Sequence, residues 1–401
     1  MQFVSNRIKA AANSNRRIHQ FYFFSRYAGR RAESGICDFT FGSPHEMPLP
    51  PLVEAIRRHA IPLNKDWFAY KTSEAEPQAF LAEHLTRELS LPFEPEDIAL
   101  TNGAFAAISV AFRLLLDVGD EAIFSTPAWF SYEPMLLTAD VMPRKVPLRA
   151  ESFDLDLDSI DAAITPQTRL IIVNTPHNPT GRIYSGATLV SLAEMLGRAS
   201  ERIGRRIFML SDEPYRRIRF DGRGFVSPAQ VYPWTVVTYS YAKVLLAPGQ
   251  RLGYLAVSPR MPWEERQAIR NHMSTAQMAL GWCYPNAVMQ YAIPDLERLS
   301  IDMPSLTAKR NRMVETLEKA GYEVLRPEGT FYLFCKCPGD DPERFWNALA
   351  DRDVFVIPGS TMDLPGYFRI CLTVSKEMVE RSLPVFAEVA ALMRKQPKPT
   401  T

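Results

Sequence analysis

The fold prediction starts from one stretch of the chain, Thr235-Val236-Val237-Thr238-Tyr239-Ser240-Tyr241-Ala242-Lys243, which is followed by Gly249-Gln250-Arg251-Leu252-Gly253. The β-branched and aromatic residues before Ser240 predict a buried strand, and Leu252 to Val257 predict another. Lys243 then lies in a turn at the carboxyl end of the first strand. A lysine in a loop is usually a solvated surface residue, but an amine flanked by hydroxyls and a guanidinium is also suited to covalent chemistry beside a phosphate.

Short apolar runs alternate with helical segments before this stretch. Leu170-Ile171-Ile172-Val173 is a continuous apolar run, as in a strand buried on both faces. A helical stripe follows it at spacings of three and four: Leu189, Leu192, Leu196, Ala199 and Ile203. Similar runs occur at 98–100, 122–125 and 207–210. The alternation predicts an α/β fold, with a large domain whose mostly parallel sheet is flanked by helices and joined by right-handed crossovers.

The pattern changes after Arg260. A long helix is expected over 263–279, followed by mixed elements: helices near 304–320 and 341–351, strands at 322–325, 331–334, 354–357 and 368–372, and a closing helix. Pro384 either kinks the closing helix or starts a second one. We therefore expect a smaller α+β domain built from the C-terminal part and the N-terminal arm. The predicted division is 1–45 for the arm and part of the small domain, 46–290 for the large domain, and 291–401 for the C-terminal small domain.

Composition narrows the class of protein. The 401 residues are 46% hydrophobic and 23% charged with a net charge of +1, which favours neither a nucleic-acid partner nor an acidic membrane. No run of eighteen apolar residues predicts a membrane span. Five scattered cysteines, with no CxxC pair, indicate reduced intracellular thiols rather than disulfides or a metal site.

The N-terminal segment has two readings. Residues 1–32 contain seven lysines and arginines (Arg7, Lys9, Arg16, Arg17, Arg26, Arg30 and Arg31) and no acid. That composition resembles a transit peptide. It also suits a basic helical arm of the folded protein, which we favour because the segment runs into folded-looking sequence without a linker.

Polar residues follow the predicted strands where those strands end. Because ligands of open parallel sheets bind outside the carboxyl ends of the strands, these residues are expected to meet. They are Asn102 and Gly103, Trp129, Asn178, Asp212 and Tyr215, and Ser240 and Lys243. An amine, a carboxylate, a stacking indole and a phosphate cradle are the groups that pyridoxal phosphate requires.

The chain resembles the class I/II aminotransferases of the aspartate aminotransferase fold (fold type I). The resemblance covers residues from about Ser5 to Met393. Its motifs occur in the family's order: Asn178-Pro179-Thr180-Gly181, Asp212-Glu213-Pro214-Tyr215, Ser240 through Gly253, and Phe368-Arg369-Ile370. Asn-Pro-Thr-Gly alone is simply a good turn, so the signal lies in the ordered set.

The resemblance implies a role for each motif residue. Lys243 would be the Schiff-base lysine and the proton carrier, with Asp212 at the pyridine nitrogen of pyridoxal phosphate. Tyr215 and Asn178 would bind its phenolic oxygen, and Trp129 would stack on its ring. Four further residues, Gly103, Ala104, Ser240 and Arg251, would hold the phosphate.

The resemblance also implies how substrate and subunits are arranged. Arg369 would clamp the substrate α-carboxylate, with Gly42 letting the backbone approach and Asn178 nearby. Tyr70 would reach the phosphate of a neighbouring subunit, which implies a homodimer with shared active sites. A cytoplasmic location is also expected. His177 and His45 are interpreted as structural.

Two segments depart from the family pattern. Trp67 to Tyr70 is expected to be extended, but Lys71-Thr72-Ser73-Glu74-Ala75-Glu76-Pro77 follows it where the family usually has glycine and then Leu-Arg. Phe105 stands two residues after Gly103, where some relatives carry a lysine that reads a distal carboxylate. Phenylalanine there favours an apolar or aromatic substrate side chain.

The predicted activity is the transfer of an amino group from an L-amino acid to a 2-oxo acid by a ping-pong mechanism. The same motifs fit a C–S lyase, an eliminase like aminocyclopropane-carboxylate synthase, or an amino-acid oxidase. A cofactor-binding regulator or inactive scaffold is a third class, disfavoured because every catalytic position is filled.

Overall fold

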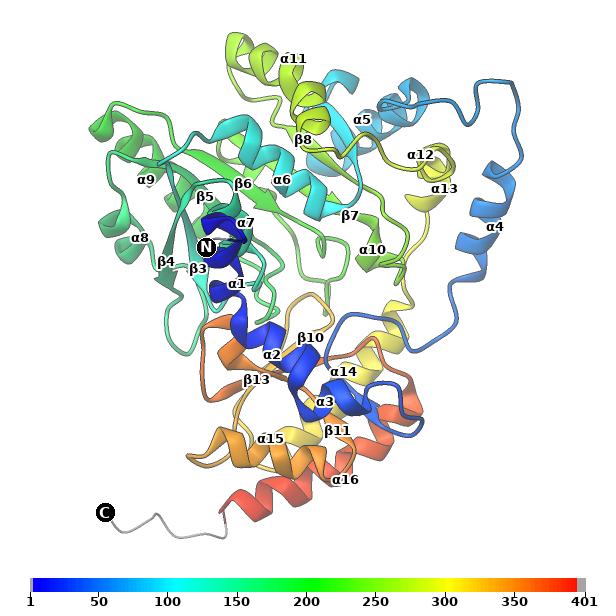
Figure 1. The fold of residues 1–401 in the computed structure, drawn as a ribbon, viewed down its shortest axis with the longest axis vertical. Helices are drawn as coiled ribbons and strands as arrows, with labels where there is room; N and C mark the ends of the chain where they lie inside the picture. Colours follow the sequence, from blue (N-terminus) through cyan, green and yellow to red (C-terminus); the bar gives the residue numbers. More distant parts are fainter. Residues whose placement is uncertain (1–2, 395–401) are drawn as a thin grey trace.

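A seven-stranded sheet forms the centre of the upper part of the molecule in the computed structural model, which describes residues 3–394 (Figure 1). The strand order is β2-β8-β7-β6-β5-β3-β4. The strand β8 runs antiparallel to its neighbours β2 and β7, and the other pairs are parallel. The bounds are β2 Ile98–Thr101, β3 Glu121–Thr126, β4 Met142–Pro147, β5 Thr168–Asn174, β6 Phe208–Asp212, β7 Thr235–Ser240 and β8 Gly253–Val257. The predicted α/β class with a mostly parallel sheet is confirmed.

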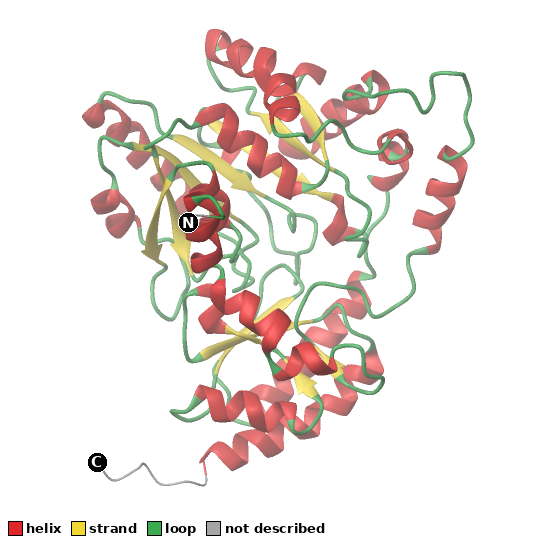
Figure 2. Cartoon of the chain, viewed as in Figure 1, coloured by secondary structure: helices red, strands yellow, loops and turns green. Residues whose placement is uncertain are grey.

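Helices cover both faces of this sheet (Figure 2). Alternate residues of β5 explain why, because Leu170 and Ile172 pack toward one set of helices and Ile171 and Val173 toward the other. The helices of this part are α4 Pro50–His59, α5 Ala75–Leu89, α6 Ala104–Leu115, α7 Tyr132–Thr138, α8 Leu157–Ala163, α9 Gly186–Ile203, α10 Tyr241–Val244, α11 Trp263–Ala279, α12 Ala287–Tyr291 and α13 Ile293–Leu296.

A smaller sheet lies below, with strand order β12-β13-β10-β9 and antiparallel pairing throughout (Figure 1). Its core is shared with three helices. The elements are α14 Met303–Lys319, β9 Val324–Leu325, β10 Tyr332–Lys336, α15 Pro342–Ala350, β12 Ile357–Pro358, β13 Tyr367–Cys371 and α16 Lys376–Arg394. A separate parallel pair joins β1 Cys37–Asp38 to β11 Val354–Phe355. The N-terminal segment thus pairs with the C-terminal part, although the domain limits remain predictions, and their ends at 1–2 and 395–401 lie outside the described residues.

The basic N-terminal segment lies on the folded body as three helices, α1 Asn6–Ser14, α2 Arg16–Phe24 and α3 Arg26–Arg30. Figure 1 shows it in blue, running from the large sheet to the small one. Its charges pair with acids on both parts: Arg7 with Asp140 at 2.7 Å, and Arg26 with Asp351 at 2.7 Å. Arg17 and Arg30 also pair with acids of the folded body, Asp363 and Asp353, so the segment is attached to that body partly by ion pairs.

Two local predictions are wrong, and a third is narrowed to one alternative. Trp67 lies in a turn rather than an extended piece, because its indole stacks on Tyr291 at 3.8 Å and donates to the His59 carbonyl. The run 354–357 is split between two sheets as β11 and β12. Of the two alternatives at Pro384, a second helix is excluded: α16 continues through the proline as one helix, since burial of Leu383, Phe386 and Val389 outweighs a proline cost of about 3 kcal/mol.

Strand β4 and helix α8 are absent from the sequence-based expectation. β4 is an edge strand whose residues Met142-Pro143-Arg144-Lys145-Val146-Pro147 show no apolar run, and it pairs only with β3. Within residues 3–394, no helix has the length and apolar character needed to cross a bilayer.

Candidate active site

A cavity of about 320 Å³ opens at the carboxyl ends of β5, β6 and β7, between the large sheet and the small one. It collects the predicted site residues except Gly103, which adjoins it, and Tyr70. Those that line it are Gly42, Ala104, Trp129, Asn178, Asp212, Tyr215, Ser240, Lys243, Arg251 and Arg369. Residues 327 positions apart in sequence thereby share one site, since Gly42 and Arg369 come from opposite ends of the chain.

Asp212 ends β6 as a buried carboxylate held by several donors. The Tyr132 hydroxyl donates to its Oδ2 at 2.5 Å and the Thr238 hydroxyl to its Oδ1 at 3.0 Å. Asn174 donates to the Asp212 carbonyl at 2.8 Å. Burial is the main influence and raises the pKa of Asp212 to about 6, against the opposing effects of the Tyr132 and Thr238 hydrogen bonds. The carboxylate is thus fixed in place and has a strong preference for a proton or cation beside it.

Lys243 projects from the single helical turn α10 rather than from an irregular turn. The strand β7 is fully buried, and Ser240 at its end caps α10 by accepting from the Ala242 amide at 3.3 Å. Burial lowers the pKa of Lys243 to about 8, assisted by the nearby cations Arg369 and Arg251. A larger neutral fraction at neutral pH makes this amine a better nucleophile.

An anion cradle lies at the start of α6. Gly103 caps this helix with a φ of +81°, and a Cβ added there would lie 3.1 Å from Arg251 Nη2. Gly253 allows the close approach, because its Cβ would lie 2.8 Å from the Gly103 Cα. The helix N-terminus and the guanidinium together suit a phosphate, and any side chain at Gly103 would fill that space.

Arg369 points from β13 into the cavity and is buried. Its Nη1 donates to Asn178 Oδ1 at 2.8 Å and its Nη2 to the Thr40 carbonyl at 3.0 Å, while Nε has no partner among the described residues. The guanidinium stacks on the Tyr332 ring at 4.0 Å. A Cβ at Gly42 would lie 3.3 Å from the Tyr332 hydroxyl, so glycine keeps this corner open.

Trp129 and Tyr215 complete the walls. Trp129 meets Phe105 edge-on, with ring centroids 4.6 Å apart and planes at 74°. The Tyr215 hydroxyl donates to that of Tyr332 at 3.2 Å. His177 is buried away from the cavity with Nδ1 2.8 Å from the Thr180 hydroxyl, in agreement with its interpretation as structural.

Four contributors were missed in the sequence: Tyr132, Asn174, Thr238 and Tyr332. Two of them carried a usable signal, because Asn174 ends β5 and Thr238 pairs in register with Asp212 on the adjacent strand. Tyr332 comes from the other sheet, so no local pattern connects it to Arg369. Tyr70 is fully exposed and does not line the cavity of its own chain.

The residues of this cavity fit pyridoxal phosphate: the Gly103–Arg251 cradle suits its phosphate, Asp212 its ring nitrogen and Lys243 its aldehyde. At this edge of a mostly parallel sheet, such a site defines a pyridoxal-phosphate enzyme of the aspartate aminotransferase fold. The family model for aminotransferase class I and II matches residues 35–385, and the chain belongs to this family.

Similar proteins match this chain along most of its length. The aspartate/prephenate aminotransferase of Thermus thermophilus is 29% identical over 372 residues, covering 90% of this chain and 92% of the relative. A probable aspartate/prephenate aminotransferase of Rickettsia bellii is 31% identical, covering 82% and 85%. A solved aminotransferase from Eubacterium rectale has a TM-score of 0.86 at 28% identity, covering 98% and 97%. The chain is thus a pyridoxal-phosphate-dependent aminotransferase, which confirms the fold, cofactor and activity implied by the resemblance.

Proposed function

We propose that this cavity transfers the amino group of an L-amino acid to a 2-oxo acid by a ping-pong mechanism. The observation that carries the proposal is the meeting of Lys243, Asp212 and Arg369 in one 320 Å³ cavity. These are an amine, a buried carboxylate and a carboxylate-binding guanidinium, contributed by two sheets.

Three residues act on the proton balance of the reaction. Pyridoxal phosphate, when bound, supplies an electron sink that makes the substrate Cα–H acidic. Asp212, as a carboxylate, would stabilise a proton on the ring nitrogen through its negative charge, and burial strengthens this interaction. Lys243 Nζ would take the proton from the substrate Cα and return it to C4′, the aldehyde carbon of the bound cofactor. Tyr215 lies beside that amine, with its ring centroid 5.9 Å from Lys243 Nζ.

Other residues bind and orient. Gly103, Ala104, Ser240 and Arg251 hold the phosphate, Trp129 covers the ring, and Asn178 binds the phenolic oxygen. Arg369 binds the substrate α-carboxylate, supported by its unpartnered Nε within the described chain and by Tyr332 beneath its guanidinium. Holding the carboxylate fixes Cα–H toward the amine.

We also propose a homodimer that works in the cytoplasm. Apolar side chains are exposed around α4 and the following turn, among them Ile61, Leu63, Phe68 and Tyr70. Such a surface suits a second copy of the chain. The cytoplasmic location is supported by the cysteines, which are all free. Substrates are small molecules, and the net charge of +1 gives no support for a nucleic-acid partner.

Tyr70 is expected to act on the partner's phosphate. Tyr70→Ala should weaken cofactor affinity by about tenfold, the effect of losing one hydrogen bond to a charged group. Mixing Tyr70→Ala subunits with Lys243→Ala subunits should then recover activity, because a hybrid dimer has one site with both native residues. The measurement is turnover after subunit exchange, with each variant exchanged against itself as the control. A monomer by light scattering, or no recovery, would contradict the shared site.

The activity itself is tested with purified holoenzyme. An amino acid alone should yield one equivalent of 2-oxo acid per site and then stop, and adding an acceptor 2-oxo acid should restore turnover. A lyase would instead continue to release ammonia and pyruvate without an acceptor. That second result would refute amino transfer as the reaction of this site.

A further inference from the structure

We propose that the amino donor carries an aromatic or large apolar side chain, and that Phe105 is the residue that selects it. The inference rests on the proposed function, because it names the substrate class of the same cavity. It differs from the aspartate named for several relatives.

Each cation of the cavity already has a role in the proposed function. Among the described residues, the basic side chains that line the cavity are Lys243, Arg251 and Arg369, and no histidine lines it. These three cations serve the cofactor aldehyde, the phosphate and the α-carboxylate respectively. A second carboxylate on the substrate would therefore find no uncommitted cation among the lining residues of its own subunit, and burial without a cationic partner is strongly unfavourable.

The remaining wall is apolar and largely aromatic. Large apolar side chains line the cavity: Phe41, Phe105, Ile108, Trp129 and Phe130. Phe41 is held by further rings, since Tyr22 meets it edge-on with centroids 5.3 Å apart. A substrate ring bound among these aromatic side chains gains edge-to-face contacts as well as burial.

Phe105 occupies the decisive position. It is the second residue of α6, directly after Ala104 and the phosphate cradle, and its ring packs against Trp129. It is 43% exposed, so a face of the ring is open for contact. A cation at this position would lie in the wall of the cavity, whereas phenylalanine offers only an apolar surface.

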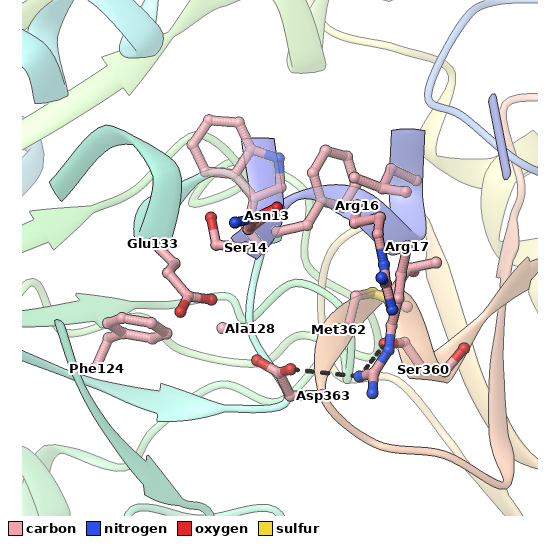
Figure 3. A pocket seen from close by; sticks show the side chains of 14 residues that line it. Asn13, Ser14, Arg16, Arg17, Phe124, Ala128, Glu133, Ser360, Met362 and Asp363 are labelled. Carbon is pink, nitrogen blue, oxygen red and sulfur yellow. Dashed lines mark hydrogen bonds and ion pairs between the residues drawn. The ribbon is translucent and has the colours of Figure 1, made fainter. Parts of the chain in front are cut away.

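Arg16 and Arg17 line an adjoining pocket rather than this cavity (Figure 3). Trp129 and Phe130 line both spaces and separate them. Arg17 already donates to the Ser360 carbonyl at 3.1 Å and lies 3.9 Å from Asp363. Two acids, Glu133 and Asp363, line the same pocket, and both pair with Lys145, at 2.5 and 2.8 Å.

The test compares two unreactive probes on the holoenzyme, 3-phenylpropionate and succinate, which lack an amino group. Dissociation constants are read from the change in cofactor absorbance, so no turnover is needed. We expect 3-phenylpropionate to bind at least about tenfold tighter, the ratio typical of one buried ring against an unpaired carboxylate. Phe105→Lys should reduce or reverse this ratio by about tenfold or more, and kcat/KM for phenylalanine against aspartate should move in the same direction.

Val190→Lys on α9 is the matched control, because Val190 is 42% exposed and α9 contributes no residue to the cavity lining. It should leave the ratio unchanged. If Phe105→Lys does not fold, Phe105→Ala should lose about tenfold in 3-phenylpropionate affinity and retain succinate affinity. Succinate binding as tightly as 3-phenylpropionate in the unaltered enzyme would overturn the substrate class, and an unchanged ratio in both Phe105 variants would overturn the role of Phe105. Loss of amino transfer with every donor would refute the proposed function, whereas the probe ratio tests the substrate class alone.

Discussion

Lys243→Ala is expected to reduce amino transfer by about 10³-fold or more, because it removes both the covalent attachment of the cofactor and the group that moves the Cα proton. No other lysine lines the cavity within the described chain, so no neighbour can replace it. Rates of 2-oxo acid formation measure the loss. Borohydride reduction followed by mass spectrometry should place the cofactor on the Lys243 peptide of the unaltered enzyme and nowhere in the variant.

Lys336→Ala is the matched control for this prediction. Lys336 lies at the exposed end of β10, paired with Glu323 at 2.9 Å, and does not line the cavity. Its loss should leave the rate within about twofold, as expected for a surface ion pair. Undiminished amino transfer by Lys243→Ala would remove the basis of the proposed site.

Asp212→Asn should lower turnover by about 10²–10³-fold while the cofactor stays bound. The carboxylate is buried and held by Tyr132 and Thr238, so an asparagine of the same shape fits, but it carries no charge to keep the ring nitrogen protonated. Cofactor content per subunit and the rate of Cα–H exchange separate binding from proton abstraction. The phosphate contacts of Gly103 and Arg251 are untouched, so the content should be nearly normal.

Asp161→Asn makes the same chemical change at a surface ion pair, where Asp161 meets Arg202 at 2.8 Å. It should have little effect on either measurement. Near-normal turnover in Asp212→Asn would mean that Asp212 does not face the ring nitrogen. Loss of the cofactor together with turnover would assign Asp212 to binding alone.

Much of the fold could be predicted because its signals are local. The apolar run of β5 and the stripe of α9 can each be read from fewer than about twenty residues, and their alternation implies a parallel sheet. The edge strand β4 gave no such signal, since its half-exposed residues carry charges and prolines. Trp67 was misjudged because its turn is set by Tyr291, more than two hundred residues away.

Some residues of the candidate site could likewise be predicted from local sequence, and others could not. Asp212 and Lys243 each follow a buried strand, and parallel strands end at one edge, so sequence order alone places them near each other. Tyr132 and Tyr332 have no comparable marker. The first reaches Asp212 from a helix after β3, and the second reaches Arg369 across the small sheet.

The class of fold and the residues suited to the cofactor could be predicted from the sequence, because strand periodicity and side-chain chemistry are properties of short segments. Only the tertiary structure decided how strongly Asp212 and Lys243 are perturbed, since their pKa values depend on burial and on charges from distant elements. The tertiary structure also brings aromatic side chains together in the cavity wall and pairs Arg7 and Arg26 of the N-terminal arm with acids. Those properties arise from packing between segments far apart in the chain, which no local pattern records.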